Sequence, residues 1–528
     1  MSYVLGLDFS TQSASACLLD SEQKIIIWEC SFPFAETFPE YKTENGVLKS
    51  VNGEVVSPPL MWVESLEKVF EALKASEVEL SKIIAISGSG QQHGSVYMNL
   101  KWREALKGLN ATESLKSQLE GVFSKELSPI WMDTSTQAEC DEIQTAVSDI
   151  AQRSGSIATM RFTGPQIRKF YKNEADAYEK TQIIHLVSSF IPSLLLGADA
   201  AIDHADGAGM NLMNLKNLDW DVELLEATAP NLLAKLPKLK PASTVLGKVS
   251  NYWVEKYGIN AEANIVAFSG DNPCSLIGLG IAESHCAAIS LGTSDTYFGI
   301  SDSLTISEKG EGHVFASPSE GYMSLICFMN GSLAREAVRQ KYKLEWDQFE
   351  KAVSNQPIGN EGKIMLPYFD EEITPASSRA QVYNYGLTED DVNANCRAVL
   401  EAQFMSMKLH SSWMSKPSVI HMTGGASQNE TIVQIAANVF GAKVKRLKTA
   451  GGAGFGAALR ALQAVTKESW SSILENYIDF DDKVVEPDLL AHKKYEELTE
   501  VYQQCEAHSL ASGADPEPQR LAFSQRWK

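Results

Sequence analysis

Two distant segments of the chain share one hydrophobic pattern: an apolar run, a polar bend and a second apolar run. In the first segment, residues 3–8 and 14–19 flank a bend of Ser, Thr and Gln. In the second, residues 287–291 and 297–300 flank a bend of Gly, Thr, Ser and Asp. Short apolar runs joined by such bends predict β-hairpins. Because the same unit occurs twice, the sequence also indicates an internally repeated architecture.

Helical and strand patterns alternate around these hairpins. Apolar residues at helical spacing predict a helix over 60–73, a helical block over about 175–196, and a helix over 430–440 that ends at Gly441. Continuous apolar runs predict strands at 82–87, 264–269 and 419–423. This alternation predicts an α/β protein.

Polar loops follow these three predicted strands, at residues 88–94, 270–273 and 424–429. The carboxyl ends of strands, where helices begin, form the ligand-binding edge of open α/β sheets. We therefore expect the three loops to contribute to a binding site.

The length and composition describe a globular protein with ample apolar residues for large cores. The chain has 528 residues, of which 44% are hydrophobic and 21% charged. Residues 236–244, which include two prolines, resemble a linker. We predict an N-terminal lobe over 1–250, a C-terminal lobe over 251–470, and a C-terminal helical extension and tail over 471–528, loosely ordered from about Ser512.

The charge balance restricts the partners. The chain has 46 basic and 67 acidic residues and a formal net charge of −21, which disfavours binding to nucleic acid and to anionic membranes. Its eight cysteines form no CxxC pair, and no uncharged apolar run reaches the length of a membrane span. No signal-peptide pattern opens the sequence. We expect a cytoplasmic protein with small-molecule partners, as a monomer or homodimer.

The two bends carry the first candidate chemistry. Gly, Ser and Thr turns expose backbone N–H groups and hydroxyls that suit phosphate oxygens, and Asp8 adds a carboxylate able to hold a hydrated cation. The alternative is that each bend is simply a turn. The occurrence of two bends, with an acid in the first, favours phosphate binding between two lobes.

The polar loops carry the second set of candidate chemical groups. Asp271 follows a strand and is a candidate general base, although an ordinary helix N-cap is the alternative. Gln91, Gln92 and His93 offer donors and acceptors for a polyol, where solvated loop residues are the alternative. Arg161 is a weaker candidate, with a surface salt bridge as its alternative. The glycine-rich segment 451–456 does not fit a dinucleotide-binding fingerprint and predicts close backbone packing at a helix start.

Together these residues resemble a known family. The chain is similar, in order and spacing over about residues 3–465, to the FGGY carbohydrate kinases, in particular to the longer eukaryotic-type branch that phosphorylates xylulose. The family has two actin-like, ribonuclease-H-like ATPase lobes with a cleft between them. The motifs that carry the resemblance are Gly6 to Thr11, Ser89 to Gly94, Arg161 to Gly164, Ile202 to Asn211, Gly270 to Pro273, Leu291 to Thr296 and Thr423 to Asn429.

The resemblance implies an ATP-dependent sugar kinase that phosphorylates the 5-hydroxyl of D-xylulose, with Asp271 as the general base and Asp8 placing Mg²⁺. Another ketopentose or polyol, such as D-ribulose, and an actin-like switch ATPase remain alternatives. The resemblance places the sugar on Gln92, His93, Arg161, Asp271 and Asn272. It places ATP on Ser10, Thr11, Gly292, Thr293, Ser294, Trp346, Gly424, Gly425, Gln428 and Asn429.

Overall fold

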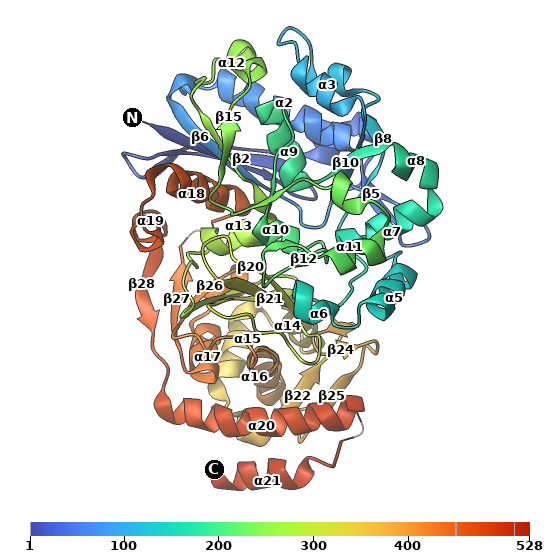
Figure 1. Ribbon diagram of the computed structural model, residues 1–528. Coiled ribbons are helices and arrows are strands. Elements are labelled where there is room, and N and C mark those ends of the chain that lie inside the picture. The colour runs from blue at the N-terminus through green and yellow to red at the C-terminus, as the bar shows by residue number, and fades with distance from the viewer. Residues whose placement is uncertain (1, 449–450, 512) are drawn as a thin grey trace.

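The first lobe is built on a seven-stranded mixed sheet. The computed structural model describes residues 2–448, 451–511 and 513–528, and its two lobes lie one above the other (Figure 1). The strands of the first sheet follow the order β15-β16-β6-β1-β2-β3, with β17 also paired to β6. They are β1 (Tyr3–Phe9), β2 (Ser13–Asp20), β3 (Ile25–Pro33), β6 (Ile83–Gly90), β15 (Val245–Lys248), β16 (Asn264–Val266) and β17 (Ser269–Gly270).

The second lobe is built on another seven-stranded sheet, in the order β20-β21-β19-β18-β26-β27-β28. Its strands are β18 (Cys286–Leu291), β19 (Asp295–Ser301), β20 (His313–Ala316), β21 (Tyr322–Phe328), β26 (Val419–Thr423), β27 (Lys443–Leu447) and β28 (Phe480–Val485).

The two sheets repeat one topology. β1 pairs antiparallel with β2 and parallel with β6, and β18 pairs in the same way with β19 and β26. Both predicted hairpins therefore exist and occupy equivalent central places in the two sheets. The predicted α/β class and internal repeat are confirmed.

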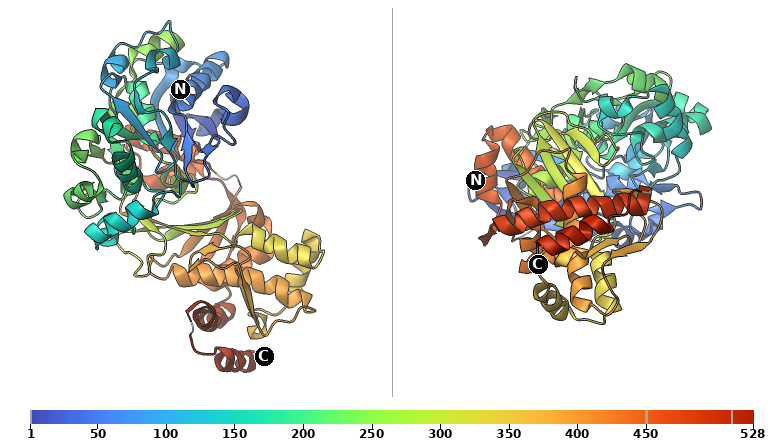
Figure 2. Two further views of the ribbon diagram at one scale, coloured as in Figure 1. Left: turned by 90° about the vertical axis from the view of Figure 1, so that its right-hand side faces the viewer. Right: turned by 90° about the horizontal axis from the view of Figure 1, so that it is seen from below.

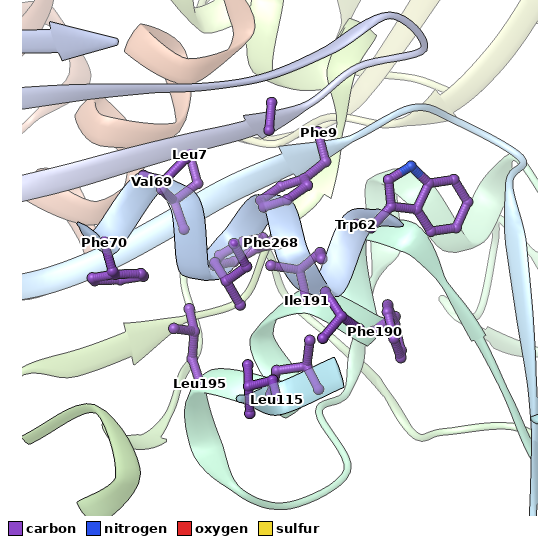
Figure 3. Close-up of a cluster of buried hydrophobic side chains, with 14 of the residues drawn as sticks. Leu7, Phe9, Trp62, Val69, Phe70, Leu115, Phe190, Ile191, Leu195 and Phe268 are labelled. Carbon is purple, nitrogen blue, oxygen red and sulfur yellow. The ribbon is translucent and has the colours of Figure 1, made fainter. Parts of the chain in front are cut away.

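Helices cover both sheets. The first core packs β1 against α2 (Pro59–Ala75) and α9 (Val187–Leu196), and Figure 3 shows Leu7, Phe9, Val69, Phe70 and Ile191 meeting there. Pro59 begins α2 at a position that needs no N–H donor, and apolar residues at helical spacing then line its buried face. The predicted helix over 60–73 is confirmed.

The second core surrounds α16 (Val392–His410), which contacts α15 (Trp346–Asn355), α17 (Glu430–Phe440) and α20 (Leu489–Ala511). Gly441 ends α17 with a φ of 64°, as predicted. α20 and α21 (Glu517–Arg526) lie at the end of the molecule remote from the first lobe (Figures 1 and 2).

The remaining helices and strands are shorter or peripheral. The helices are α1 (Phe34–Thr37), α3 (Trp102–Lys107), α4 (Leu115–Leu119), α5 (Gln137–Ala146), α6 (Ile150–Ser154), α7 (Thr163–Asn173), α8 (Ala175–Lys180), α10 (His204–Ala208), α11 (Val222–Thr228), α12 (Asn251–Tyr257), α13 (Asp271–Gly278), α14 (Ser332–Lys341), α18 (Ala453–Thr466) and α19 (Trp470–Tyr477). The strands are β4 (Leu48–Lys49), β5 (Val55–Ser57), β7 (Ser95–Asn99), β8 (Phe123–Lys125), β9 (Ser128–Pro129), β10 (Thr181–Leu186), β11 (Ile202–Asp203), β12 (Met213–Asn214), β13 (Asp219–Trp220), β14 (Leu239–Lys240), β22 (Ile364–Pro367), β23 (Glu372–Ile373), β24 (Ala376–Ser377) and β25 (Val382–Tyr385). Within the described ranges, no helix is both long and apolar enough to span a membrane.

The helical block predicted over 175–196 is wrong in its centre. Residues 181–186 form β10, which pairs antiparallel with β7, and only the flanks are helical, as α8 and α9. This short segment contains Ile183 and Ile184, whose branched side chains suit a buried strand. Pairing with a distant strand outweighs the helical spacing of its apolar residues.

The pairing of strands in the first sheet also continues past residue 250, where we predicted the boundary between the lobes. The supposed linker at 236–244 contains β14, which pairs with β11 in the first lobe, and β15 and β16 then complete the first sheet. Its two prolines, Pro237 and Pro241, therefore flank β14 within that lobe. We propose that the lobe boundary lies at 279–285, between α13 and β18, and that α18 returns to the first lobe.

The C-terminal region is more regular than predicted. Ser512 lies outside the described residues, but residues 517–526 form α21. Phe523 on this helix is buried in the second core. The expectation of a loosely ordered tail is therefore wrong for these residues, because Phe523 anchors them to the lobe.

Helix α18 packs backbone to backbone on the first lobe. A Cβ on Gly6 in β1 would lie 1.9 Å from the carbonyl oxygen of Gly454, and one on Gly456 would lie 1.9 Å from the carbonyl oxygen of Cys274 in α13. Only glycine allows so close an approach. The close packing predicted for segment 451–456 is thus confirmed for these glycines.

We expect Gly6→Ala to lower the free energy of unfolding by about 2 kcal/mol or more, because a backbone oxygen cannot move aside as a side chain does. Chemical denaturation of the purified variant measures this. Gly425→Ala is the control, since a Cβ there meets nothing within 4 Å. Equal stability of the two variants would contradict the packing argument.

Candidate active site

Neighbouring strands bring three predicted site segments together at one edge of the first sheet. Phe9 at the end of β1 stands opposite Gly90 at the end of β6, and Gly90 stands opposite Gly270 at the end of β17. The backbone N–H of Gln91 also donates to the carbonyl oxygen of Phe9, at 2.8 Å. The strands that lead into the first bend, the loop at 91–93 and Asp271 therefore end next to one another.

A cleft of about 560 Å³ opens at this edge and is lined by both lobes. Thr11 reaches it from the first bend and Ser294 from the second, with Asp271 in the same cleft. The other predicted residues that line it are Gln92, His93, Arg161 and Asn272. The structure thus brings the two bends, which are distant in sequence, to one cavity.

Asp271 is the first residue of α13, and Gly270 occupies the N-cap position. The Asp271 Oδ1 atom accepts from the backbone N–H of Asn272 at 2.9 Å and from that of Gln92 at 3.3 Å. These bonds fall on Oδ1, so Oδ2 is the oxygen available to take a proton. Burial outweighs these hydrogen bonds and raises the pKa of Asp271 to about 6.

Asp8 lies next to this acid at the end of β1. Ser89 donates its hydroxyl to Asp8 Oδ1 at 2.7 Å. Burial is the main cause that raises the pKa of Asp8 to about 7, and the charge of Asp271 adds to it. Two carboxylates that disfavour each other's ionisation suit a bound cation. Among the described residues no cluster of three or more His, Cys, Asp or Glu side chains could hold a metal ion, so such a cation would need further oxygen ligands.

His93 is held in one orientation. Its backbone has a φ of 69°, its ring stacks on Phe162 with centroids 4.2 Å apart, and Nδ1 lies 2.7 Å from the carbonyl oxygen of Gly209. Burial and the nearby Arg161 guanidinium hold the pKa of His93 well below its ordinary value. The neutral ring therefore donates from Nδ1, which leaves Nε2 as an acceptor.

The groups beside His93 are polar and partly unpaired. Gln92 accepts from Asn272 Nδ2 through Oε1 at 2.8 Å. Both amide atoms of the fully buried Gln91 lack a hydrogen-bond partner within the described part of the chain. Arg161 forms no ion pair with any described residue, so the alternative of a surface salt bridge is not observed. Unpaired donors and acceptors of this kind suit a polyhydroxyl ligand.

His313 and Trp131 are among the cleft residues that were not predicted. His313 faces the cleft from the second lobe, with Nδ1 3.1 Å from Ser156 Oγ, and burial lowers the pKa of His313 to about 3. Trp131 donates from Nε1 to Thr11 Oγ1 at 2.7 Å, which leaves the Thr11 hydroxyl hydrogen for another acceptor. A single His or Trp in a long sequence carries no local signal of such a contact.

The second bend lies beside the predicted nucleotide loop. Ser290 in β18 stands opposite Thr423 in β26, and a Cβ on Gly424 would lie 2.1 Å from the carbonyl oxygen of Leu291. Segments 292–294 and 424–429 are therefore neighbours. The buried ion pair of Arg335 with Asp295, with N···O distances of 2.7 and 3.1 Å, fixes the end of this bend.

Several predicted nucleotide residues have other contacts. The Ser10 hydroxyl donates to the carbonyl oxygen of Ser13 at 3.0 Å and closes the first bend. Asn429 caps α17 by accepting from the Ile432 N–H at 3.0 Å. Trp346 is 51% exposed at the start of α15, with the Arg339 guanidinium 5.1 Å from its ring centre. Of the described residues that line the cleft, none belongs to the set Ser10, Gly292, Thr293, Trp346, Gly424, Gly425, Gln428 and Asn429.

Solved structures share this fold. The xylulose kinase from Rhodospirillum rubrum superposes with a TM-score of 0.82 at 18% identity, over 96% of this chain and 99% of that chain. The ligand-bound xylulose kinase from Lactobacillus acidophilus superposes with a TM-score of 0.80 at 21% identity, over 96% and 98%. These likenesses confirm the two-lobed fold.

Sequence comparison identifies the family. Xylulose kinase 2 from Arabidopsis thaliana is 43% identical, over 87% of each chain, and the xylulose kinase from Rattus norvegicus is 40% identical, over 87% of this chain and 88% of its own. The N-terminal domain of the FGGY family of carbohydrate kinases matches residues 125–278, and its C-terminal domain matches residues 287–465. The chain therefore belongs to the FGGY family of carbohydrate kinases.

Proposed function

We propose that the protein transfers the terminal phosphoryl group of ATP to the 5-hydroxyl of D-xylulose. The observation that carries this proposal is the single cleft in which Thr11 and Ser294, from the two bends, meet beside Asp271. The names of the relatives, at up to 43% identity, support xylulose as the sugar. Phosphoryl transfer needs mainly positioning and electrostatic stabilisation, which a two-sided cleft provides.

Asp271 acts as the general base in this proposal. Its Oδ2 atom takes the proton of the sugar hydroxyl as the oxygen attacks phosphorus, while the bonds to Oδ1 hold the carboxylate in place. Because burial raises the pKa of Asp271 to about 6, it is a better proton acceptor than an exposed aspartate and still ionises near neutral pH.

The sugar lies on the first lobe in this proposal. His93 Nε2 accepts from one hydroxyl, the unpaired Arg161 guanidinium donates to another oxygen, and the Gln92 and Asn272 amides orient the end that reacts. His93, Gln92 and Asn272 have other bonds fixed by the fold, whereas the Arg161 guanidinium, which forms no ion pair with a described residue, is free to pair with the ligand. Stereochemical choice among ketopentoses follows from this arrangement of donors and acceptors.

The nucleotide lies across the two bends. Thr11 and Ser294 donate to the phosphates, with the N–H groups of Gly292 and Thr293, and segment 424–428 with Trp346 borders the adenosine. Asp8 fits a magnesium ion because it is a partly buried carboxylate beside a second one. When bound, Mg²⁺ neutralises phosphate charge. Ser10 and Asn429 act here through their structural bonds to the bend and to α17.

A coupled ADP-release assay over a panel of pentuloses and alditols tests the proposed activity. We expect turnover that depends on both sugar and Mg²⁺ and is greatest with D-xylulose. ADP release that does not depend on sugar would indicate a switch ATPase, and higher kcat/KM with D-ribulose would overturn the choice of substrate.

Asp271→Asn should lower kcat by roughly 10³-fold or more, because the amide keeps the shape but cannot take the proton. Calorimetry should show that ATP still binds. Asp390→Asn, an exposed carboxylate of the second lobe, is the matched control and should keep the parental rate. An active Asp271→Asn enzyme would remove Asp271 from its proposed role.

His93→Asn should weaken sugar binding by roughly 10-fold or more, since it removes the Nε2 acceptor, and leave ATP binding nearly unchanged. Asparagine tolerates the positive φ of this position better than alanine, so the variant separates binding from backbone strain. Isothermal titration with each ligand provides the measurement. Equal losses for sugar and ATP would refute the assignment.

A further inference from the structure

A buried histidine of the second lobe lies between two carboxylates outside the cleft. His410, the last residue of α16, is 2% exposed. Its Nδ1 atom lies 2.9 Å from Glu311 Oε1, and its Nε2 atom lies 3.2 Å from Glu506 Oε1. We call Glu311, His410 and Glu506 the His410 relay, because they join three elements that are far apart in sequence.

The relay is ionic at neutral pH. Burial lowers the pKa of His410, but the bonds to Glu311 and Glu506 outweigh it and raise the pKa to about 9. A neutral imidazole has one N–H donor, whereas the imidazolium has two. Both carboxylate bonds therefore exist together only while the ring is protonated.

One end of the relay is helix α20 of the C-terminal extension, which carries Glu506. Glu506 Oε1 also accepts from the Tyr368 hydroxyl at 2.9 Å. The neighbouring Tyr502 and Tyr495 of α20 are fully buried against the second core. Figure 1 shows α20 at the end of the second lobe, remote from the first lobe, so any influence of α20 on the cleft must pass through residues between them.

The other end of the relay forms a wall of the cleft. Glu311 stands between Gly310 and Gly312, which line the cleft together with His313. The two glycines have φ angles of 71° and 74° and provide little stiffness of their own. The backbone N–H groups of Gly310 and Glu311 bond to Ser307, and His313 pairs with Leu325 in β21. The Glu311 side chain adds an anchor to the second lobe between these two attachments.

This wall also meets the first lobe. His313 Nδ1 lies 3.1 Å from Ser156 Oγ, and the Val314 N–H donates to the carbonyl oxygen of Gly155 at 3.0 Å. A shift of Glu311 would thus displace both the cleft wall and a contact between the lobes.

We propose that the His410 relay positions residues 310–313 for sugar binding, with Glu506 on α20 holding His410 and His410 holding Glu311. The proposal rests on the proposed function, because it takes the cleft as the sugar site. It gives the C-terminal extension a role in substrate affinity. Glu311, His410 and Glu506 are positioning residues, since none of them lines the cleft.

Steady-state kinetics distinguish a role in positioning the sugar site from a role in packing alone. We expect Glu506→Gln and Glu311→Gln each to raise the KM for sugar roughly 10-fold, and to change kcat and the KM for ATP less than about twofold. The double variant should be little worse than either single one, because either change removes a negative charge that keeps both nitrogens of His410 protonated. Glu500→Gln, on the exposed face of α20, is the matched control and should behave as the parent.

Hydrogen exchange followed by mass spectrometry tests the relay without any substrate. Peptides covering 302–313 should exchange faster in Glu506→Gln than in Glu500→Gln. In the parent, the protection of these peptides from exchange should fall as the pH rises through about 9, where His410 loses its proton. In Glu506→Gln the same loss of protection should occur at lower pH. The titratable groups that face the His410 ring are Glu311 and Glu506, and Tyr368 and Tyr502 lie behind Glu506. Burial raises the pKa values of the two tyrosines, so both tyrosines stay protonated in this pH range.

Two results would overturn the proposal. One is a sugar KM and an exchange rate that match the control in both Glu506→Gln and Glu311→Gln. The other is a parallel loss of sugar and ATP affinity with a lower melting temperature, which would make the relay a packing element only. If the parent phosphorylates no ketopentose while Glu506→Gln still speeds exchange at 302–313, the proposed function fails and the link from α20 to the cleft wall stands.

Discussion

The direct contact between helix α18 and the first lobe determines where the acids of the site stand. Gly6 lets the Gly454 carbonyl approach β1, and Gly456 lets α18 approach α13. β1 ends beside Asp8, and α13 begins with Asp271. Helix α18 thus packs on the two elements that carry the paired carboxylates. The chain forms this helix only after it has completed most of the second sheet. The rest of the cleft is arranged around that pair.

The electrostatics of the cleft follow from burial around this pair. Asp8 and Asp271 both have raised pKa values, and His93 and His313 have lowered ones, because each charged form loses water. Arg161 supplies an unpaired cation beside the two neutral imidazoles. A polar ligand that brings hydroxyls, phosphates and a divalent cation would satisfy these groups together. The strongly negative net charge of the chain does not oppose this, because the binding groups are local.

Sequence patterns predicted the parts of the structure that depend on neighbours in the chain. The two hairpins, α2, α17 with its Gly441 end, and the placement of Asp271 after a strand all have local signals, and the structure has each of them. Strand β10 was missed because its partner β7 lies far away in sequence. The first sheet continues past the predicted boundary at 250, because β16 joins it only through tertiary pairing. His313 and the His410 relay unite distant elements, so no window of sequence contains their signal.

In the proposed mechanism, the two bends hold one triphosphate next to the acid that activates the sugar. A crystal structure with Mg²⁺, a non-hydrolysable ATP analogue and D-xylulose tests it most directly. We expect a terminal phosphate between Thr11 and Ser294, with the sugar 5-hydroxyl within hydrogen-bond distance of Asp271 Oδ2. A nucleotide bound away from either bend, or a sugar whose 5-hydroxyl points away from Asp271, would contradict it.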